Sequence, residues 1–381
     1  MPRKRLTVGE DDEGPWLFTP GPINTDKRTK QAMLRDMGSR DGDFVAMTAR
    51  VRERLLAVSG AGGGYVCVPI QGSGTFAVEA AFGTLVPPNG KVLVLVNGVY
   101  GRRIARICEI ARRAVTILET AETATPSGGD VARALADDPA VSHVALVHCE
   151  TTSGILNPAE DIAAAVAQSG RRLIVDAMST FGILPLAAQT VAYDALVASS
   201  NKCLEGVPGM GFAVVKREAL ASCAGHAHSL ALDLHDQWQF LERAGQWRFT
   251  PPTHVMAALD TALALLEAEG GTPARLARYR RNCEILVAGM RRLGFRTLIP
   301  DRLQAPVIVT FEYPADPRFR FEAFYERLRR RGFVIYPGKL TRADTFRIGC
   351  IGAIGTEQIE GLVAAVGEVC GEMGLTLAPA L

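Results

Sequence analysis

The stretch "YDALVASSNKCLEGVPGMGFAVV" at residues 193–215 decides how this chain folds. An apolar run ends at Ser199 and Ser200, Lys202 follows directly, and a second apolar run begins after a turn rich in glycine and proline. Short, continuous apolar runs are typical of strands covered on both faces in a parallel sheet. A lysine at the end of such a strand is expected to have a charge partner or a chemical use, because burying an unpaired charge is unfavourable.

Similar apolar runs alternate with helix-like segments on both sides of this stretch. The pattern predicts an α/β fold whose large domain, residues 17–265, contains a mostly parallel sheet. A smaller α+β domain is expected over residues 266–381, and residues 1–16 form a tail without an assigned role. Within the large domain we expect strands at 91–98, 141–150, 171–178, 193–200 and 211–220, helices at 102–113 and 159–170, and a surface loop at 122–130.

The composition excludes several classes of function. Among 381 residues, 42 basic and 40 acidic side chains leave a net charge of +2, so no nucleic-acid partner is expected. The eight cysteines show neither C-x-x-C nor zinc spacing, which predicts free buried thiols in a reducing compartment and no metal site. The chain begins without an apolar signal core and has no run of about 18 apolar residues. We therefore expect a cytoplasmic protein that does not contact a membrane.

Polar groups follow the predicted strands at the edge where open α/β sheets bind their ligands. Ser73, Gly74 and Thr75 can hold a phosphate at a helix N-terminus, or they can form a tight turn. The side chains that follow four further strands are Tyr100, Thr151, Asp176 and Lys202.

Each of these side chains also has an ordinary structural explanation. Asp176 can cap a helix or pair with a buried cation, Tyr100 can cover a ring or belong to the core, and Lys202 can pair with Asp176 or form a Schiff base. A single ligand with a phosphate, an aromatic face, a ring nitrogen and an aldehyde explains all of them together. That ligand is pyridoxal phosphate.

Nine segments extend this pattern over the chain from about residue 17 to the C-terminus. They are "LFTPGP" (17–22), "QGSGTFAVEA" (71–80), "NGVYGRR" (97–103), "VHCETTSGILNP" (147–158), "IVDAMSTFG" (174–182), "SSNKCLEGVPG" (199–209), "WRFTPPTH" (247–254), "GFVIYPGK" (332–339) and "FRIGCIG" (346–352). The set resembles the class V aminotransferases, which are fold-type I pyridoxal-phosphate enzymes. Within that family it resembles the branch that acts on 2-aminoethylphosphonate and pyruvate.

The resemblance implies a role for each matching residue around the cofactor. Lys202 would bind the cofactor covalently and move the proton, Asp176 would bind the pyridinium nitrogen, and Tyr100 would stack on the ring. Thr151 would hydrogen-bond the phenolic oxygen. The phosphate would be held by Ser73, Gly74 and Thr75.

Three further residues are implied to act on the substrate or between subunits. Thr250 and Thr253 match a segment that reaches the phosphate of the neighbouring subunit's cofactor, which implies a homodimer with shared active sites. Arg347 matches the arginine that grips the acidic group of the substrate, although it can also be a structural arginine on a strand of the small domain.

The expected reaction converts 2-aminoethylphosphonate and pyruvate to phosphonoacetaldehyde and L-alanine. An alternative is a transaminase of the same fold that uses alanine or serine with glyoxylate. A cysteine desulfurase is less favoured, because no cysteine falls in a loop that is both mobile and close to Lys202. A non-catalytic scaffold would be expected to lose Lys202 or Asp176, and both are present.

Overall fold

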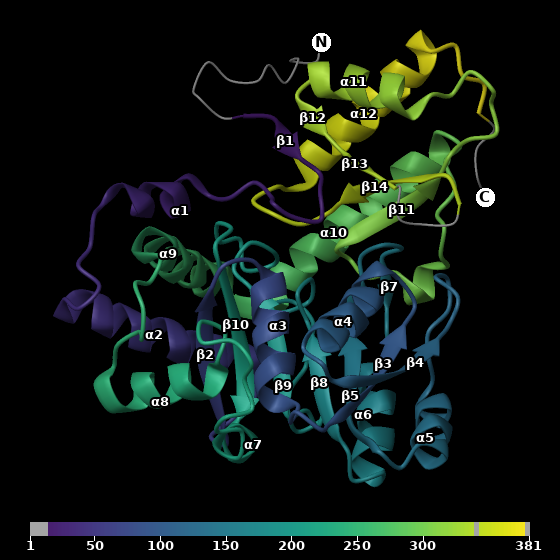
Figure 1. The fold of residues 1–381 in the computed structure, drawn as a ribbon. Helices are drawn as coiled ribbons and strands as arrows, with labels where there is room; N and C mark the ends of the chain where they lie inside the picture. Colours follow the sequence, from purple (N-terminus) through teal and green to yellow (C-terminus); the bar gives the residue numbers. More distant parts are fainter. Residues whose placement is uncertain (1–13, 339–342, 378–381) are drawn as a thin grey trace.

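The computed structural model describes residues 14–338 and 343–377. Residues 1–13 of the expected tail therefore lie outside the described residues. Figure 1 shows a larger part built around one sheet and a smaller part that contains the C-terminal helix.

The larger part contains a seven-stranded sheet with the order β2-β10-β9-β8-β5-β3-β4. Strand β10 is antiparallel to both of its neighbours, β2 and β9, and the other strand pairs are parallel. This arrangement confirms the expected α/β fold with a mostly parallel sheet. The strands are β2 (Tyr65–Gln71), β3 (Lys91–Val96), β4 (Ala114–Glu119), β5 (Val141–Val147), β8 (Arg172–Asp176), β9 (Ala195–Ser199) and β10 (Met210–Lys216).

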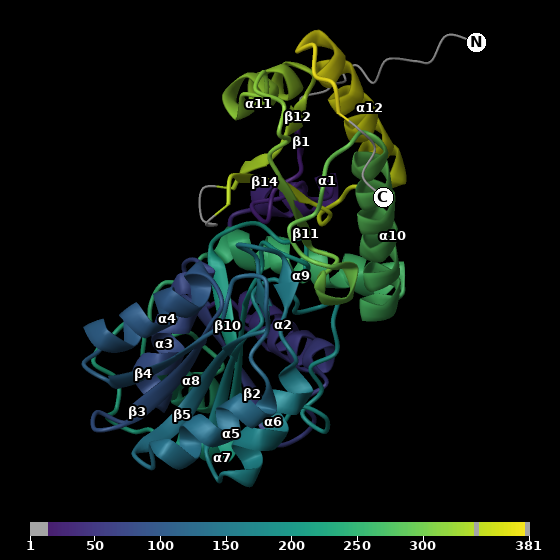
Figure 2. The ribbon, with the colours of Figure 1, turned by 90° about the vertical axis from the view of Figure 1, so that its right-hand side faces the viewer.

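Helices cover both faces of this sheet, as Figure 2 shows. On one face, α3 packs on β9 and β10 while α4 packs on β3, β4 and β5. On the other face, α2 packs on β2 and β10, and α6 packs on β8. Because both faces are covered, all five residues of β9 are buried, which explains its continuous apolar sequence. The helices of this part are α1 (Lys27–Gln31), α2 (Gly42–Ser59), α3 (Gly74–Leu85), α4 (Val99–Ile110), α5 (Gly128–Asp137), α6 (Ala159–Gln168), α7 (Arg217–Ala221), α8 (Leu234–Ala244) and α9 (Thr253–Glu269).

The smaller part contains a three-stranded sheet with the order β11-β14-β13, beside α10, α11 and α12. Its core is rich in phenylalanine, with Phe346 packed against Phe295, Phe311 and Phe324. The division at residues 265 and 266 stays a prediction. Its elements are α10 (Gly271–Arg292), β11 (Ile308–Glu312), α11 (Phe321–Arg330), β12 (Phe333–Val334), β13 (Tyr336–Pro337), β14 (Thr345–Gly349) and α12 (Thr356–Glu372).

Three local expectations differ from the structure. The strand expected to reach residue 220 ends at Lys216, and α7 follows it. The loop expected at 122–130 ends earlier, because Ser127 and Asp130 form a capping box that begins α5. Strand β4 was not expected from the sequence.

The structure also describes the state of the cysteines and the character of the helices. All eight cysteines lie in the described ranges, where they are free and buried, as expected. Among the described residues, the model has no helix that is both long and apolar enough to cross a membrane.

Candidate active site

A cavity with about 260 Å³ of space between its atoms, part of it open to solvent, lies where the carboxyl ends of β5 and β8 meet the turn after β9. A second hollow, also partly open to solvent, adjoins it, and Tyr100, Asp176 and Met178 line both. The first cavity is also lined by Val147, Cys149, Thr151, Ser179 and Lys202, and the second by Gly74, Thr75, Val78, Arg103 and Ile104.

Lys202 lies in a tight turn directly after β9. The turn is closed by backbone hydrogen bonds from Glu205 N–H to the Lys202 carbonyl (2.8 Å) and from Gly206 N–H to the Ser200 carbonyl (2.8 Å). The Nζ atom donates to the carbonyl of Pro20. Burial lowers the pKa of the Lys202 amine to about 8, against the opposing effects of Cys203 and Asp176. A larger fraction of this amine is therefore neutral near pH 7 than for an ordinary lysine.

Asp176 is the last residue of β8 and is 6% exposed. Its Oδ1 atom accepts a hydrogen bond from the Met178 N–H at 2.9 Å. Burial raises the pKa of this carboxyl to about 6, while Met178, Arg103 and Lys202 act in the opposite direction. A cation placed in the cavity beside Asp176 would favour the charged carboxylate.

The N-terminus of α3 opens onto the second hollow. Ser73 precedes the helix, is exposed, and makes no side-chain capping bond there, while Gly74 and Thr75 line the hollow. A Cβ atom on residue 74 would lie 2.5 Å from the Met178 Sδ atom, so a side chain at this position would displace the flexible Met178 side chain that lines both hollows. Free backbone N–H groups at a helix N-terminus attract an anion such as a phosphate.

Tyr100 is held in the first turn of α4 by a buried carboxylate. Oε2 of Glu150 accepts hydrogen bonds from the backbone N–H groups of Tyr100 (3.1 Å) and Gly101 (3.3 Å). Oε1 of Glu150 accepts from the Thr152 hydroxyl, and burial raises the pKa of Glu150. A negative charge at this position also interacts favourably with the N-terminal end of α4.

Arg347 lies on β14 with 1% of its surface exposed. Its Nη1 donates to the backbone carbonyl of Thr151 at 2.8 Å, and its Nη2 donates to the carbonyl of Pro337 at 3.1 Å. The guanidinium carbon lies 4.8 Å from the ring centroid of Tyr336, and burial lowers the pKa of the guanidinium group. Arg347 therefore contacts the backbone of Thr151, a residue of the first cavity.

Thr250 and Thr253 do not join this group within one chain. Thr250 is exposed, and Thr253 is the partly buried first residue of α9. Neither lines the two hollows.

Several cavity residues were missed from the sequence. Arg103 places its guanidinium carbon 4.8 Å from the centroid of the Tyr100 ring, and its Nη1 lies 3.4 Å from the Thr75 Oγ1. Met178 lines both hollows and lies beside Gly74 at the α3 terminus, and Cys149 lines the first cavity. The signal for Cys149 was its position after β5, shared with Thr151. Burial raises the pKa of the Cys149 thiol well above its usual value, which disfavours a nucleophilic thiolate.

Comparison with known proteins is consistent with this geometry. The model of the family "Aminotransferase class-V" matches residues 27–332. A protein of Pseudomonas aeruginosa named 2-aminoethylphosphonate–pyruvate transaminase is 57% identical over 362 residues, which cover 95% of this chain and 98% of that protein. A protein of Pseudomonas putida with the same name is 55% identical over 359 residues, covering 94% of this chain and 98% of that protein.

Solved structures agree on the fold. Pyridoxamine-pyruvate aminotransferase from Mesorhizobium loti matches with a TM-score of 0.87 and 25% identity, covering 97% of this chain and 95% of its own. Ureidoglycine-glyoxylate aminotransferase from Bacillus subtilis matches with a TM-score of 0.85 and 23% identity, covering 96% of this chain and 95% of its own. These likenesses confirm the expected fold-type I architecture, and the chain belongs to the class V aminotransferase family.

Proposed function

We propose that this chain transfers the amino group of 2-aminoethylphosphonate to pyruvate, with phosphonoacetaldehyde and L-alanine as products. The supporting observation is the cavity in which Lys202, Asp176 and Tyr100 converge beside the N-terminus of α3. The substrates are those in the name of a relative that is 57% identical and is covered almost end to end.

The residues of the cavity fit pyridoxal phosphate, the cofactor of class V aminotransferases. The α3 terminus with Gly74 leaves room for the phosphate, Asp176 offers a buried carboxylate for the ring nitrogen, and Lys202 offers an amine for the aldehyde. When bound, the cofactor supplies a carbonyl group and a ring that stabilises negative charge on the substrate carbon.

Lys202 is the residue that moves protons in this proposal. Its lowered pKa leaves part of the amine neutral near pH 7, so Nζ can attack a carbonyl and can accept and return the proton of the substrate carbon. The partly enclosed cavity limits the access of water to Nζ during this transfer.

Asp176 and Tyr100 orient the ring, while Arg347 orients the substrate. A charged Asp176 holds a proton on the ring nitrogen, and the face of Tyr100 stacks against the ring. The planar guanidinium of Arg347 can bind a phosphonate or a carboxylate with two parallel hydrogen bonds. One arginine can therefore serve both half-reactions in turn. Thr151, whose carbonyl binds Arg347, provides a hydroxyl for the phenolic oxygen of the ring.

We further propose a homodimer in which Thr250 and Thr253 reach the cofactor phosphate of the partner subunit. Support comes from the exposed position of Thr250, which lines neither hollow of its own chain. The cytoplasm is the proposed location, because a reducing compartment suits eight buried free thiols.

A substrate panel tests the proposed reaction. The protein loaded with pyridoxal phosphate is incubated with 2-aminoethylphosphonate or with serine or alanine as donor, and with pyruvate or glyoxylate as acceptor. We expect the highest kcat/KM for 2-aminoethylphosphonate with pyruvate, measured as alanine formed. A higher value for alanine or serine with glyoxylate would contradict the proposed substrates and favour the alternative pair.

A further inference from the structure

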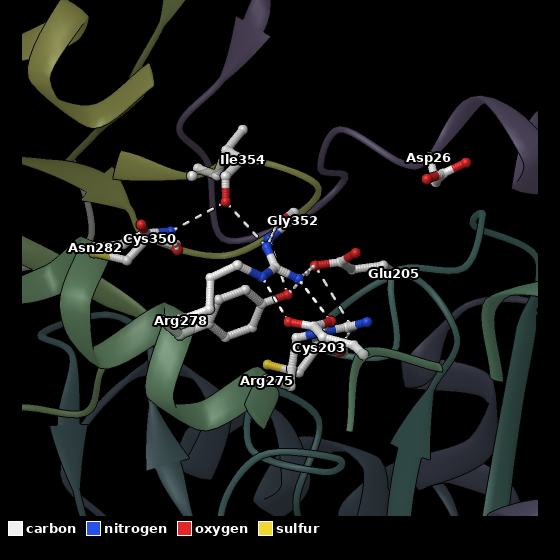
Figure 3. A network of polar contacts seen from close by, with 12 residues as sticks. Asp26, Cys203, Glu205, Arg275, Arg278, Asn282, Cys350, Gly352 and Ile354 are labelled. Carbon is white, nitrogen blue, oxygen red and sulfur yellow. Dashed lines mark hydrogen bonds and ion pairs between the residues drawn. The ribbon is translucent and has the colours of Figure 1, made fainter. Parts of the chain in front are cut away.

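A partly buried cluster of charged side chains contacts Cys203 and Glu205, in the turn that follows Lys202 (Figure 3). Glu205 belongs to that turn and has a positive φ of 58°. Its Oε1 atom accepts hydrogen bonds from Nη2 of Arg278 at 2.7 Å and from the hydroxyl of Tyr279 at 2.5 Å. Arg275 adds a bond from its Nη1 to the carbonyl of Cys203 at 2.8 Å. We call Glu205, Glu269, Arg275, Arg278 and Tyr279 the α10 cluster.

Two of these α10 side chains, Arg278 and Tyr279, also bind the loop that follows β14, the strand of Arg347. Nη1 of Arg278 donates to the carbonyls of Gly352 (2.7 Å) and Ile354 (3.0 Å). The hydroxyl of Tyr279 accepts from the Gly352 N–H at 3.1 Å. Arg278 and Tyr279 therefore each bridge the turn that holds Lys202 and the loop that leaves β14. Figure 3 shows Arg278 between Glu205 on one side and Gly352 and Ile354 on the other.

Other members of this region contact only one of the two sides. Arg275 binds the carbonyl of Cys203 and the carboxylate of Glu269, and Asn282 binds the carbonyls of Cys350 and Ile354. Of these four α10 residues, Arg278 and Tyr279 are the ones that form hydrogen bonds to both the turn after β9 and the loop after β14.

The energetics favour a geometric role over a purely stabilising one. Glu205 and Glu269 balance the charges of Arg275 and Arg278, and the side chain of Arg275 is only 2% exposed. Buried ion pairs of this kind add little net stability compared with apolar residues, because desolvation offsets their attraction. They do restrict the relative positions of the segments that carry them, because a buried charge that moves away from its partner is left unpaired.

We infer that Arg278 and Tyr279 are positioning residues that fix the spacing between Lys202 and Arg347, and thereby the length of amine substrate that the site accepts. The inference rests on the proposed function, in which Lys202 acts at the amine end of the substrate and Arg347 binds its acidic end. A spacing held by two short bridges favours one chain length between these ends. Loosening a bridge lets the site accept a longer amine.

The test compares two substrates that differ by one methylene, 2-aminoethylphosphonate and 3-aminopropylphosphonate, with the complete enzyme and pyruvate. A fitted site discriminates one methylene by roughly 10- to 200-fold. Tyr279→Phe removes the hydroxyl and both of its hydrogen bonds but keeps the ring. In this variant we expect the ratio of kcat/KM for 2-aminoethylphosphonate to kcat/KM for 3-aminopropylphosphonate to fall by at least about threefold. The reason is that the net free energy of a single hydrogen bond corresponds to a factor of about three or more.

Tyr65→Phe is the matched control. The Tyr65 hydroxyl donates to the carbonyl of Tyr193 at 2.8 Å, at the start of β2 and away from the cavity. We expect this variant to keep the wild-type substrate ratio even if its unfolding temperature falls. An unchanged ratio in Tyr279→Phe, with both kcat/KM values lowered equally, would overturn the inference and leave the α10 cluster a structural one.

A second variant covers the case in which Tyr279→Phe does not fold. Arg278→Lys keeps the charge, but a single ammonium does not reproduce the guanidinium fork that reaches Glu205 and Gly352 together. The same fall in the ratio is expected. If the wild-type protein prefers another amine, the proposed function fails, and the spacing is then tested with that amine and its homologue one methylene longer.

Discussion

Two ionisable side chains face the cavity with pKa values displaced toward neutrality, Lys202 to about 8 and Asp176 to about 6. Burial is the main cause in both residues, and it disfavours the charged form of each. Strongly perturbed groups that converge in one cavity are typical of a catalytic site. Single substitutions of Lys202 and Asp176 should therefore change the activity or the stability of the protein measurably.

Replacing Lys202 by alanine tests the role of the amine. Lys202→Ala is expected to keep the fold and to lose at least about a hundredfold in transamination, the lower range of what a positioned acid–base group contributes. Lys216→Ala is the matched control, because Lys216 pairs at the surface with Glu218. Borohydride treatment followed by mass spectrometry should attach the cofactor to the wild type and to the control only. Normal turnover in Lys202→Ala would contradict the role.

Replacing Asp176 by asparagine tests the buried carboxyl through stability. Its pKa of about 6 in the folded state lies above the usual 3.8, so between these values the folded protein binds more protons than the unfolded chain. Stability of the cofactor-free protein is then lost as pH rises through this window. Above about pH 6 the carboxyl lowers stability by on the order of 3 kcal/mol, at about 1.4 kcal/mol per pKa unit.

Asp176→Asn should therefore gain stability relative to wild type above about pH 6, and the gain should shrink toward pH 4. Urea unfolding of both proteins without cofactor, at pH 4, 5, 6 and 7.5, measures the difference. Adding pyridoxal phosphate should stabilise the wild type more than the variant. A constant difference between the two proteins at every pH would show that the carboxyl does not titrate in this window.

The sequence predicted the strand-end residues of the cavity but not those whose contribution depends on side-chain direction. Tyr100, Thr151, Asp176 and Lys202 could be grouped because strand ends in a parallel sheet meet at one edge. Arg103 is on a helical turn, and only its packing on Tyr100 brings it to the hollow. The roles of all the predicted site residues stay predictions.

At the scale of elements, the start of α4 lies so close to the short strand β6 (Cys149–Glu150) that residue 98, which precedes the helix, has no room for a side chain. A Cβ atom there would lie 2.3 Å from the carboxyl carbon of Glu150, the residue that binds the first turn of α4. Gly98→Ala is expected to displace Glu150 and to lower the free energy of unfolding by about 1–3 kcal/mol, the usual effect of overpacking.

Gly63→Ala, in the turn before β2, is the control substitution, because a Cβ atom there meets nothing within 4 Å. Its effect on the free energy of unfolding should stay within about 0.5 kcal/mol. Urea unfolding measures both variants, and Gly98→Ala should also weaken cofactor binding, since Tyr100 moves with the turn. If the two variants have equal free energies of unfolding, Glu150 can move away from residue 98 without lowering the stability, and the prediction is wrong.

Strand β4 and helix α5 were not predicted from the sequence, each for its own physical reason. Strand β4 is at the edge of the sheet and has no buried residue, and its sequence AVTILE shows neither a continuous apolar run nor strict alternation of apolar and polar residues. Helix α5 begins at Gly128 and Gly129, which favour a loop on intrinsic propensity, and the capping box at Ser127 overcomes that preference. The buried strands β3, β5, β8 and β9 were found because both faces require apolar side chains.

At the scale of the whole molecule, the N-terminal segment joins the far end of the chain. Trp16 and Leu17 form β1, which pairs in parallel with Phe333 and Val334 of β12. Phe18 is buried in the phenylalanine-rich core of the smaller part. A two-residue strand has no periodicity, so this long-range contact could not be predicted. It places Pro20, whose carbonyl binds Lys202, between the two parts of the molecule.

The proposed homodimer can be tested by mixing two inactive variants. One chain carries Lys202→Ala, and the other carries Thr250→Val with Thr253→Val. If each cofactor is held by Lys202 of one subunit and the threonines of the other, a mixed dimer contains one complete site and one with both defects. Each variant alone should have little activity because every site in it lacks one set of groups.

Co-expression with two different affinity tags and sequential purification isolates the mixed dimer. We expect its transamination rate to exceed that of both parents, because one of its two sites has every required residue. Mixing Lys202→Ala with Asp176→Asn is the control, since Lys202 and Asp176 line one cavity of the same chain and neither site of that mixed dimer is complete. If the threonine mixture is no more active than the mean of its parents, the sites are not shared and Thr250 and Thr253 have no role in the partner's phosphate site.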